Sequence, residues 1–271
     1  MKKIQFCILL SLCLLFTFHT SSSYAGSIAE REVLDNGITL LHSEKTVLPI
    51  VTVVVAIKAG SVVETPEKAG LANLTADLLN EGTKSRTSKE ISDAIEFVGG
   101  SLNTSGGADY ITVSLSVLKK DVELGFDLLS DVILNPAFSD DEIKRRITSI
   151  KNSIIQQKEE PDVIASKAFN EAVFGKHPYG RPVEGKEETL DRITREDISA
   201  FYEEHYLPNN TIITVVGDIS KSELRSLLQR YFMSWRKKDG EETLLPPPVF
   251  EDRPKVIKIQ KGAPKVPIEI I

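Results

Sequence analysis

The spacing of hydrophobic residues changes several times along the chain, which predicts strands that alternate with helices. The run REVLDNGITLLHS indicates a hairpin, because Asp35-Asn36-Gly37 is a strong turn signal between two extended runs. PIVTVVVAIKAG is rich in β-branched residues and predicts a strand buried on both faces, and NTIITVVGD predicts a further buried strand. DYITVSLSVL alternates apolar and polar residues, which predicts a half-buried strand.

Helical spacing separates these strands. Residues 67–83 predict one amphipathic helix, because Leu71, Leu74 and Leu78 recur at the spacing of a buried helical stripe. Gly82 stands where a C-terminal glycine commonly ends such a helix. Comparable spacing predicts later helices within residues 87–98, 119–135, 139–160, 197–206 and 220–231.

Three of these helices begin with a recognisable cap. Thr87 with Glu90, and Ser139 with Glu142, have the spacing of a capping box, and Ser220 with Glu223 caps the last helix. Strands separated by helix pairs, rather than by single crossover helices, favour an α+β fold over a doubly wound sheet. We therefore expect a mixed sheet covered by helix pairs.

Residues 1–25 have the pattern of a signal peptide, with a short basic start, an apolar core and small residues before an expected cleavage after Ala25. No later segment approaches about 18 consecutive apolar residues, so we expect no integral membrane segment after cleavage. The protein is therefore expected to be exported, either to the periplasm or into the medium.

The cysteines and the charged residues exclude some kinds of site and partner. Both cysteines, Cys7 and Cys13, lie in the leader, which excludes disulfides and zinc–thiolate sites from the mature chain. Without Lys2 and Lys3 the chain keeps 31 basic and 39 acidic residues, a net charge of −8, and shows no large basic stripe. We expect no nucleic-acid partner.

The last part of the chain changes composition. Residues 237–254, KKDGEETLLPPPVFEDRP, are charged and rich in proline, which is typical of a linker. Residues 255–271, KVIKIQKGAPKVPIEII, then repeat the pattern of GITLLHSEKTVLPIVTVVVAI. We expect one domain at residues 26–236, a linker, and the start of a second, truncated repeat.

One polar face of the helix predicted at residues 67–83 requires an explanation. Asn73, Asp77 and Glu81 recur every four residues, so their side chains stack along one side. They could form a solvated face, a polar site, or the remains of one. A calcium or magnesium site is disfavoured, because one carboxylate and one amide are too few for these ions.

Four segments in order, AGSVVETPEKAGLANLTADLLNEGT, GGSLNTSGGADYITVSLSVL, HPYGRPVEG and FYEEHYLPNNTIITVVGDI, resemble the N-terminal half of the insulinase/pitrilysin family, which includes the mitochondrial processing peptidase. The resemblance runs from about Arg31 to the C-terminus. It implies a half-unit of that fold. Active members of the family hold a zinc ion through an H-x-x-E-H motif, and the resemblance places the corresponding positions on the helix at residues 67–83.

The residues at the family's zinc positions differ in this chain. The flanking GLA and LLNEGT place Asn73 and Asp77 at the two histidine positions and Ala76 at the general base. Spacing places Ser153 at the third ligand, which is a glutamate in active members. Ala76 cannot accept a proton and Ser153 is a poor zinc ligand, so the resemblance implies a vacated metal site.

Other histidines do not replace the missing ligands. His42, His177 and His205 are far apart in the sequence and lack a paired i, i+4 spacing. We interpret His177 as a loop or packing residue and His205 as the polar end of a helix. No bound cofactor is expected, whereas active relatives carry zinc.

The segment SLNTSGG carries a second expectation. In the family the equivalent edge strand receives an extended substrate by β-addition, which implies that Leu102, Asn103 and Thr104 bind peptide through backbone hydrogen bonds. A plain glycine-rich turn into a strand is the alternative.

The resemblance and the altered zinc positions favour an exported non-catalytic subunit that binds peptide. It would assist proteolysis together with a zinc-bearing homologue or a separate C-terminal half. Two alternatives stay open. One is an active metalloendopeptidase with rearranged zinc ligands, and the other is a truncated gene fragment.

Overall fold

The computed structural model describes residues 28–238, 247, 256–259 and 268–270. The predicted signal peptide at residues 1–25 and most of the predicted linker lie outside the described residues. The predicted start of a second repeat is described only at residues 256–259 and 268–270, where β7 (Ile257–Ile259) pairs antiparallel with β8 (Ile268–Ile270).

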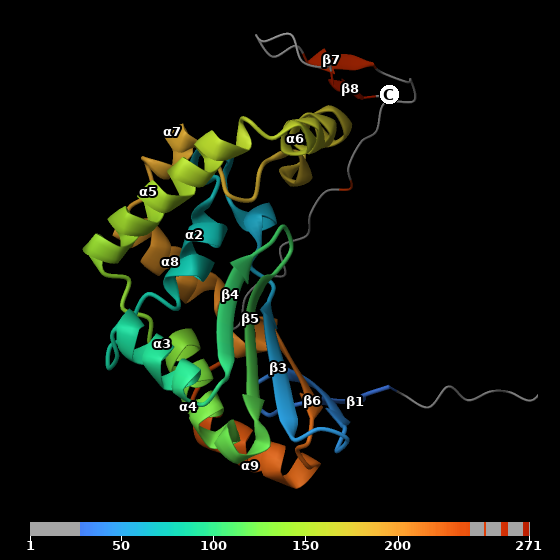
Figure 1. Cartoon of the computed structure of the whole chain (residues 1–271), viewed down its shortest axis with the longest axis vertical. Coiled ribbons are helices and arrows are strands. Elements are labelled where there is room, and N and C mark those ends of the chain that lie inside the picture. Colours follow the sequence, from blue (N-terminus) through green and yellow to red (C-terminus); the bar gives the residue numbers. More distant parts are fainter. Residues whose placement is uncertain (1–27, 239–246, 248–255, 260–267, 271) are drawn as a thin grey trace, which may run out of the picture.

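A six-stranded mixed sheet forms the centre of the domain (Figure 1). Its strands follow the order β1-β2-β6-β3-β5-β4 across the sheet. β2 and β6 are parallel, and every other neighbouring pair in this sheet is antiparallel. β4 therefore lies at one edge. The strands are β1 (Glu30–Val33), β2 (Thr39–Glu44), β3 (Ile50–Ile57), β4 (Ser101–Gly106), β5 (Ile111–Leu118) and β6 (Thr211–Gly217).

The α-helices gather on one side of this sheet, as Figure 1 shows, which confirms the predicted α+β fold. The 3-10 turn at Pro66–Lys68 comes just before the first of them. None of the helices in the described part of the chain is long and apolar enough to cross a membrane. The helices are α2 (Leu71–Leu78), α3 (Ser88–Phe97), α4 (Val122–Leu134), α5 (Asp140–Gln157), α6 (Pro161–Phe174), α7 (Glu187–Leu190), α8 (Arg195–His205) and α9 (Lys221–Tyr231).

The helices cover only one face of the sheet, so the prediction that residues 49–60 form a strand buried on both faces is wrong. Along β3, Val51, Val53 and Val55 are fully buried, whereas Ile50 is 38% exposed. β6 alternates in the same way, with Val216 41% exposed, so it is half-buried. Burial of each valine side chain stabilises the folded state by about 1.5–3 kcal/mol, so these residues help to hold the covered face of the sheet against the helices.

Two local predictions about helix ends have opposite outcomes. Thr87 and Glu90 form the predicted capping box at the start of α3. Ser139 precedes α5 but makes no side-chain cap, so the second predicted box is wrong. The carboxylate of Glu142 instead accepts a hydrogen bond of 2.6 Å from Nε of Arg145, three residues later on the same helix.

The helix predicted at residues 67–83 is shorter in the structure. Gly70 has φ +99°, a left-handed conformation that starts α2 at Leu71. The helix ends at Leu78, four residues before Gly82, which has φ +120°. α6 was not singled out by the sequence pattern, because its apolar side chains are not confined to one face and none is buried.

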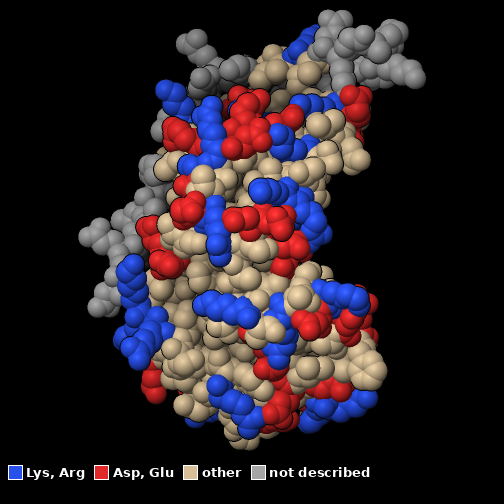
Figure 2. Space-filling view, turned by 90° about the vertical axis from the view of Figure 1, so that its left-hand side faces the viewer, with Lys and Arg blue, Asp and Glu red and all other residues tan. Residues whose placement is uncertain are grey.

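Charges of both signs are mixed on the helix-covered side of the domain. Figure 2 shows Lys and Arg interspersed with Asp and Glu over this side. Such a surface has no single-sign patch of the kind that binds a phosphate backbone.

Candidate functional site

α2 lies along the edge strand β4, and contacts at its two ends fix this arrangement. At one end, a Cβ atom on Gly106 would lie 2.6 Å from Cα of Asn73, so the close approach requires glycine. At the other end, Nδ2 of Asn80 donates a hydrogen bond of 3.2 Å to the carbonyl oxygen of Leu102. The helix and the strand therefore run in opposite directions, and Asp77 lies level with the middle of β4.

A buried carboxylate holds the start of α2. Glu64 accepts hydrogen bonds from the backbone N–H of Gly70 (3.0 Å) and from that of Ala72 (2.5 Å). Burial raises the pKa of Glu64 from 4.5 to about 7, although these two donors and the charge of Arg181 act in the opposite direction. An acidic side chain here occupies N–H groups that have no partner within the helix.

Asp77 is the centre of the polar cluster on α2. Its Oδ2 accepts hydrogen bonds from Nε of Arg146 (3.0 Å) and from Nδ2 of Asn73 (3.3 Å). Nη2 of Arg146 lies 2.9 Å from the same oxygen, which completes an ion pair between α2 and α5. The side chain of Asp77 is only 10% exposed, so this carboxylate is compensated by the guanidinium and not by water.

The surroundings of Asp77 are largely dry. Burial raises the pKa of Asp77 above its ordinary value, although Arg146 lowers it. Tyr206, which follows the end of the neighbouring α8, is 2% exposed, and burial raises its pKa well above the ordinary value. Its hydroxyl has no hydrogen-bond partner among the described residues. The cluster therefore lies at the boundary between the core and the surface.

The residues at the predicted zinc positions do not fit zinc. Asn73 contributes an amide, Asp77 is occupied by Arg146, and the buried Ala76 offers a methyl group. Ser153 is exposed on α5, seven residues beyond the arginine that faces Asp77. Within the described ranges, no three His, Cys, Asp or Glu side chains are grouped so as to hold a metal ion. The set offers an amide, a carboxylate already paired with Arg146 and a hydroxyl, and it has none of the imidazoles or thiolates that zinc sites commonly use.

The histidines are used elsewhere in the fold. Nε2 of His42 lies 2.9 Å from the carbonyl oxygen of Ile219. Nδ1 of His177 accepts a hydrogen bond from the backbone N–H of Tyr179, as a residue that caps the turn at 178–180. His205 is the last residue of α8. His177 therefore lies in a loop and His205 ends a helix, as we interpreted these two residues from the sequence.

The edge strand β4 directs backbone groups away from β5 at alternate residues. The backbone N–H of Gly107 donates to the carbonyl oxygen of Tyr110 (2.9 Å), so Gly107 faces the partner strand. The carbonyl oxygen of Leu102 accepts a hydrogen bond from Asn80, so it faces away from β5. In an antiparallel ladder the residues that face outward alternate, which leaves Leu102, Thr104 and Gly106 facing the edge. Asn103 points its backbone groups toward β5.

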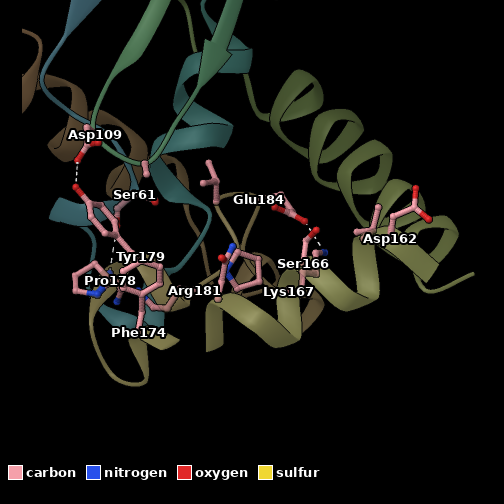
Figure 3. A pocket seen from close by; sticks show the side chains of 15 residues that line it. Ser61, Asp109, Asp162, Ser166, Lys167, Phe174, Pro178, Tyr179, Arg181 and Glu184 are labelled. Carbon is pink, nitrogen blue, oxygen red and sulfur yellow. Dashed lines mark hydrogen bonds and ion pairs between the residues drawn. The ribbon is translucent and has the colours of Figure 1, made fainter. Parts of the chain in front are cut away.

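A pocket of 650 Å³ opens between α6 and the turn that joins β4 to β5 (Figure 3). The hydroxyl of Tyr179 donates to Oδ1 of Asp109 at 2.7 Å, which links the two sides. Lys167 on α6 forms an ion pair of 2.6 Å with Glu184. Ala108 and Asp109 of the turn that follows β4 line the pocket, so it lies next to the end of the edge strand.

Comparison with known families identifies the class of protein that this fold and site define. Residues 40–187 match the family described as Insulinase (Peptidase family M16), and residues 192–270 match the one described as Peptidase M16 inactive domain. The chain belongs to the insulinase family, which confirms the resemblance inferred from the sequence.

Curated relatives give the same assignment. An uncharacterized zinc protease of Mycobacterium leprae is 30% identical over 204 residues, which cover 75% of this chain and 46% of the relative. The uncharacterized zinc protease YmxG of Bacillus subtilis is 27% identical over 221 residues, or 82% of this chain and 54% of the relative. The chain thus spans about half the length of the curated relatives it matches.

Solved structures support the fold. A peptidase M16 inactive domain from Pseudomonas fluorescens superposes with a TM-score of 0.77 at 24% identity, over 82% of this chain and 54% of the other. A protease from Helicobacter pylori gives a TM-score of 0.74 at 22% identity, over the same shares of the two chains. At these identities the likeness establishes the architecture alone.

Sequence reasoning missed Arg146 and Glu64. A signal for Arg146 was present, because it lies between Ile143 and Ile150 in helical spacing and so borders the buried stripe of α5. Glu64 precedes a proline-containing turn, and nothing in the local pattern distinguishes it from an exposed loop acid.

Proposed function

We propose that this protein is a non-catalytic member of the insulinase family that binds an extended peptide along β4. It acts with a zinc-bearing homologue, or with a separate C-terminal half, in proteolysis. The protein is exported in this proposal, on the basis of the predicted signal peptide at residues 1–25.

The observation that carries the proposal is the state of Asp77. In a zinc peptidase the corresponding position would direct a lone pair at the metal, whereas Asp77 is committed to Arg146 at 2.9 Å. Ala76 is fully buried and cannot take a proton from a water molecule. The site has neither the ligands nor the base for metal-assisted hydrolysis.

The edge strand supports the binding part of the proposal. β4 has a neighbour on one side only within the described sheet, and Thr104 and Gly106 direct backbone groups outward. An extended peptide can pair with such an edge and needs no catalytic group.

Metal analysis of the purified protein tests the proposal. We expect far less than one zinc ion per chain, and no peptidase activity that a chelator abolishes. One zinc ion per chain together with chelator-sensitive cleavage would establish the competing function, a metalloendopeptidase with rearranged ligands. The same preparation with Asn73→Ala serves as a control, because an authentic ligand at this position would lower the zinc content when removed.

A further inference from the structure

Arg146 of α5 places a positive charge beside Asp77, one of the residues at the predicted zinc-ligand positions. Its Nε and Nη2 both contact Oδ2 of Asp77, at 3.0 and 2.9 Å. Asn73 adds a third donor to this one oxygen at 3.3 Å. Three N–H groups thus converge on a single carboxylate oxygen of α2.

The geometry explains how α2 keeps its place without a metal. A bound metal ion can join side chains from two helices, and the Asp77–Arg146 pair joins α2 and α5 in the same way. Asp77 is the more buried partner, at 10% exposed, whereas Arg146 is 35% exposed. Loss of either partner would leave the other without its compensating charge.

The same pair affects any cation that approaches α2. The guanidinium cannot lose its proton in a protein, so it is a permanent positive charge beside Asn73 and Asp77. A divalent ion a few ångströms away would be repelled, and its carboxylate ligand is already occupied. Arg145, the adjacent residue, instead pairs with Glu81 and Glu142 and is 61% exposed.

We propose that Arg146 is a built-in replacement for the metal ion, which holds α2 against α5 and excludes divalent cations from the Asn73–Asp77 site. This inference rests on the proposed non-catalytic function. It adds that peptide binding at β4 is independent of metal, because α2, which lies along this strand, is held to α5 by an ion pair.

Variants that remove one positive charge from adjacent positions of α5 test the structural part. Thermal unfolding with chelator present should show a fall in Tm of about 5 °C for Arg146→Gln, and a smaller change for the matched control Arg145→Gln. The double variant Asp77→Asn/Arg146→Gln should recover much of that loss, because the uncompensated carboxylate is then absent. Equal effects of the two single variants would overturn this part.

Zinc binding tests the exclusion part, with zinc itself as the probe. The variant Asn73→His/Ala76→Glu/Asp77→His/Ser153→Glu supplies the family's ligand set, and it is compared with and without Arg146→Gln. Removal of Arg146 should strengthen zinc binding by about tenfold or more, whereas Arg145→Gln in the same background should not. An unchanged affinity overturns the exclusion.

The two proposals fail separately. Stoichiometric zinc in the wild-type protein would refute the non-catalytic function. A metal-free wild type, with no difference between the arginine variants, would refute the role of Arg146 alone.

Discussion

Asn80, two residues after the end of α2, donates its side-chain N–H to the carbonyl oxygen of Leu102 on the edge strand at 3.2 Å. The pairing of β4 with β5 sets which residues of β4 face outward, and the contact with Asn80 already occupies one of the carbonyl groups that a peptide could use. A bound peptide therefore depends mainly on the backbone of Thr104 and Gly106.

The first prediction concerns this edge. Thr104→Pro removes an outward N–H and should abolish pairing of a peptide with β4, while the protein stays folded, because proline is tolerated on an exposed edge. Asn103→Pro is the matched control, since it removes an N–H that points to β5 and should destabilise the fold by about 1–3 kcal/mol through the lost ladder hydrogen bond. Fluorescence anisotropy with a labelled peptide and urea unfolding measure the two effects.

A reversed result for these variants would disprove the assignment of the edge. If Thr104→Pro still binds the peptide, and neither variant is less stable than the wild type, the peptide pairs with another part of the protein.

The second prediction concerns pH. The pKa of Glu64 is about 7 in the folded protein, whereas its ordinary value is 4.5. Between pH 4.5 and 7 the folded state therefore binds more protons at this group than the unfolded state does. The free energy of unfolding should therefore fall as pH rises from about 4.5 to 7, by about 3 kcal/mol from this group. Urea unfolding at a series of pH values measures the slope.

Substitution isolates the contribution of Glu64. Glu64→Gln cannot ionise and should lack this part of the slope, whereas Glu67→Gln, an exposed neighbour, should keep it. Equal slopes for all three proteins would contradict the assignment to Glu64.

The third prediction concerns partial restoration of the zinc site. Asn73→His/Asp77→His should bind zinc weakly and hydrolyse no peptide, because Ala76 provides no base and Ser153 no carboxylate. Calorimetric zinc titration and a peptidase assay check this. Robust cleavage by this double variant would show that the ligand assignment or its register is wrong.

The fourth prediction concerns the partner. We expect the protein to co-purify from its native host with a zinc-bearing homologue or a separate C-terminal half. Chelator-sensitive peptidase activity should appear only in the mixed complex. A stable monomer that does not bind zinc-bearing relatives in a pull-down would count against a subunit role.

Local features of this protein were predictable from the sequence because neighbouring residues determine them. The hairpin at Asp35-Asn36-Gly37 and the capping box at Thr87 depend on a few adjacent residues, and both are present. The burial of β3 was not predictable in this way. It depends on whether a second layer covers the sheet, and β-branched residues occur in strands with either environment.

In the candidate site, too, local features were predictable from the sequence and long-range contacts were not. The sequence register placed Asn73, Ala76 and Asp77 on one helix, and they lie there. The partner of Asp77 is 69 residues away, and its identity depends on how α5 crosses α2. Contacts of this kind follow from packing of the whole domain, which no local pattern encodes.

The position of β6 in the sheet has a consequence for the order of folding. β6 lies between β2 and β3, and Thr39 pairs with Ile212, which is 173 residues later in the chain. During synthesis the first hairpin and β3 cannot become neighbours in one sheet until the chain has been made through Gly217. Such non-local pairing slows folding. A nascent chain that ends before residue 211 would lack the strand that joins its two parts, so the domain completes its core late.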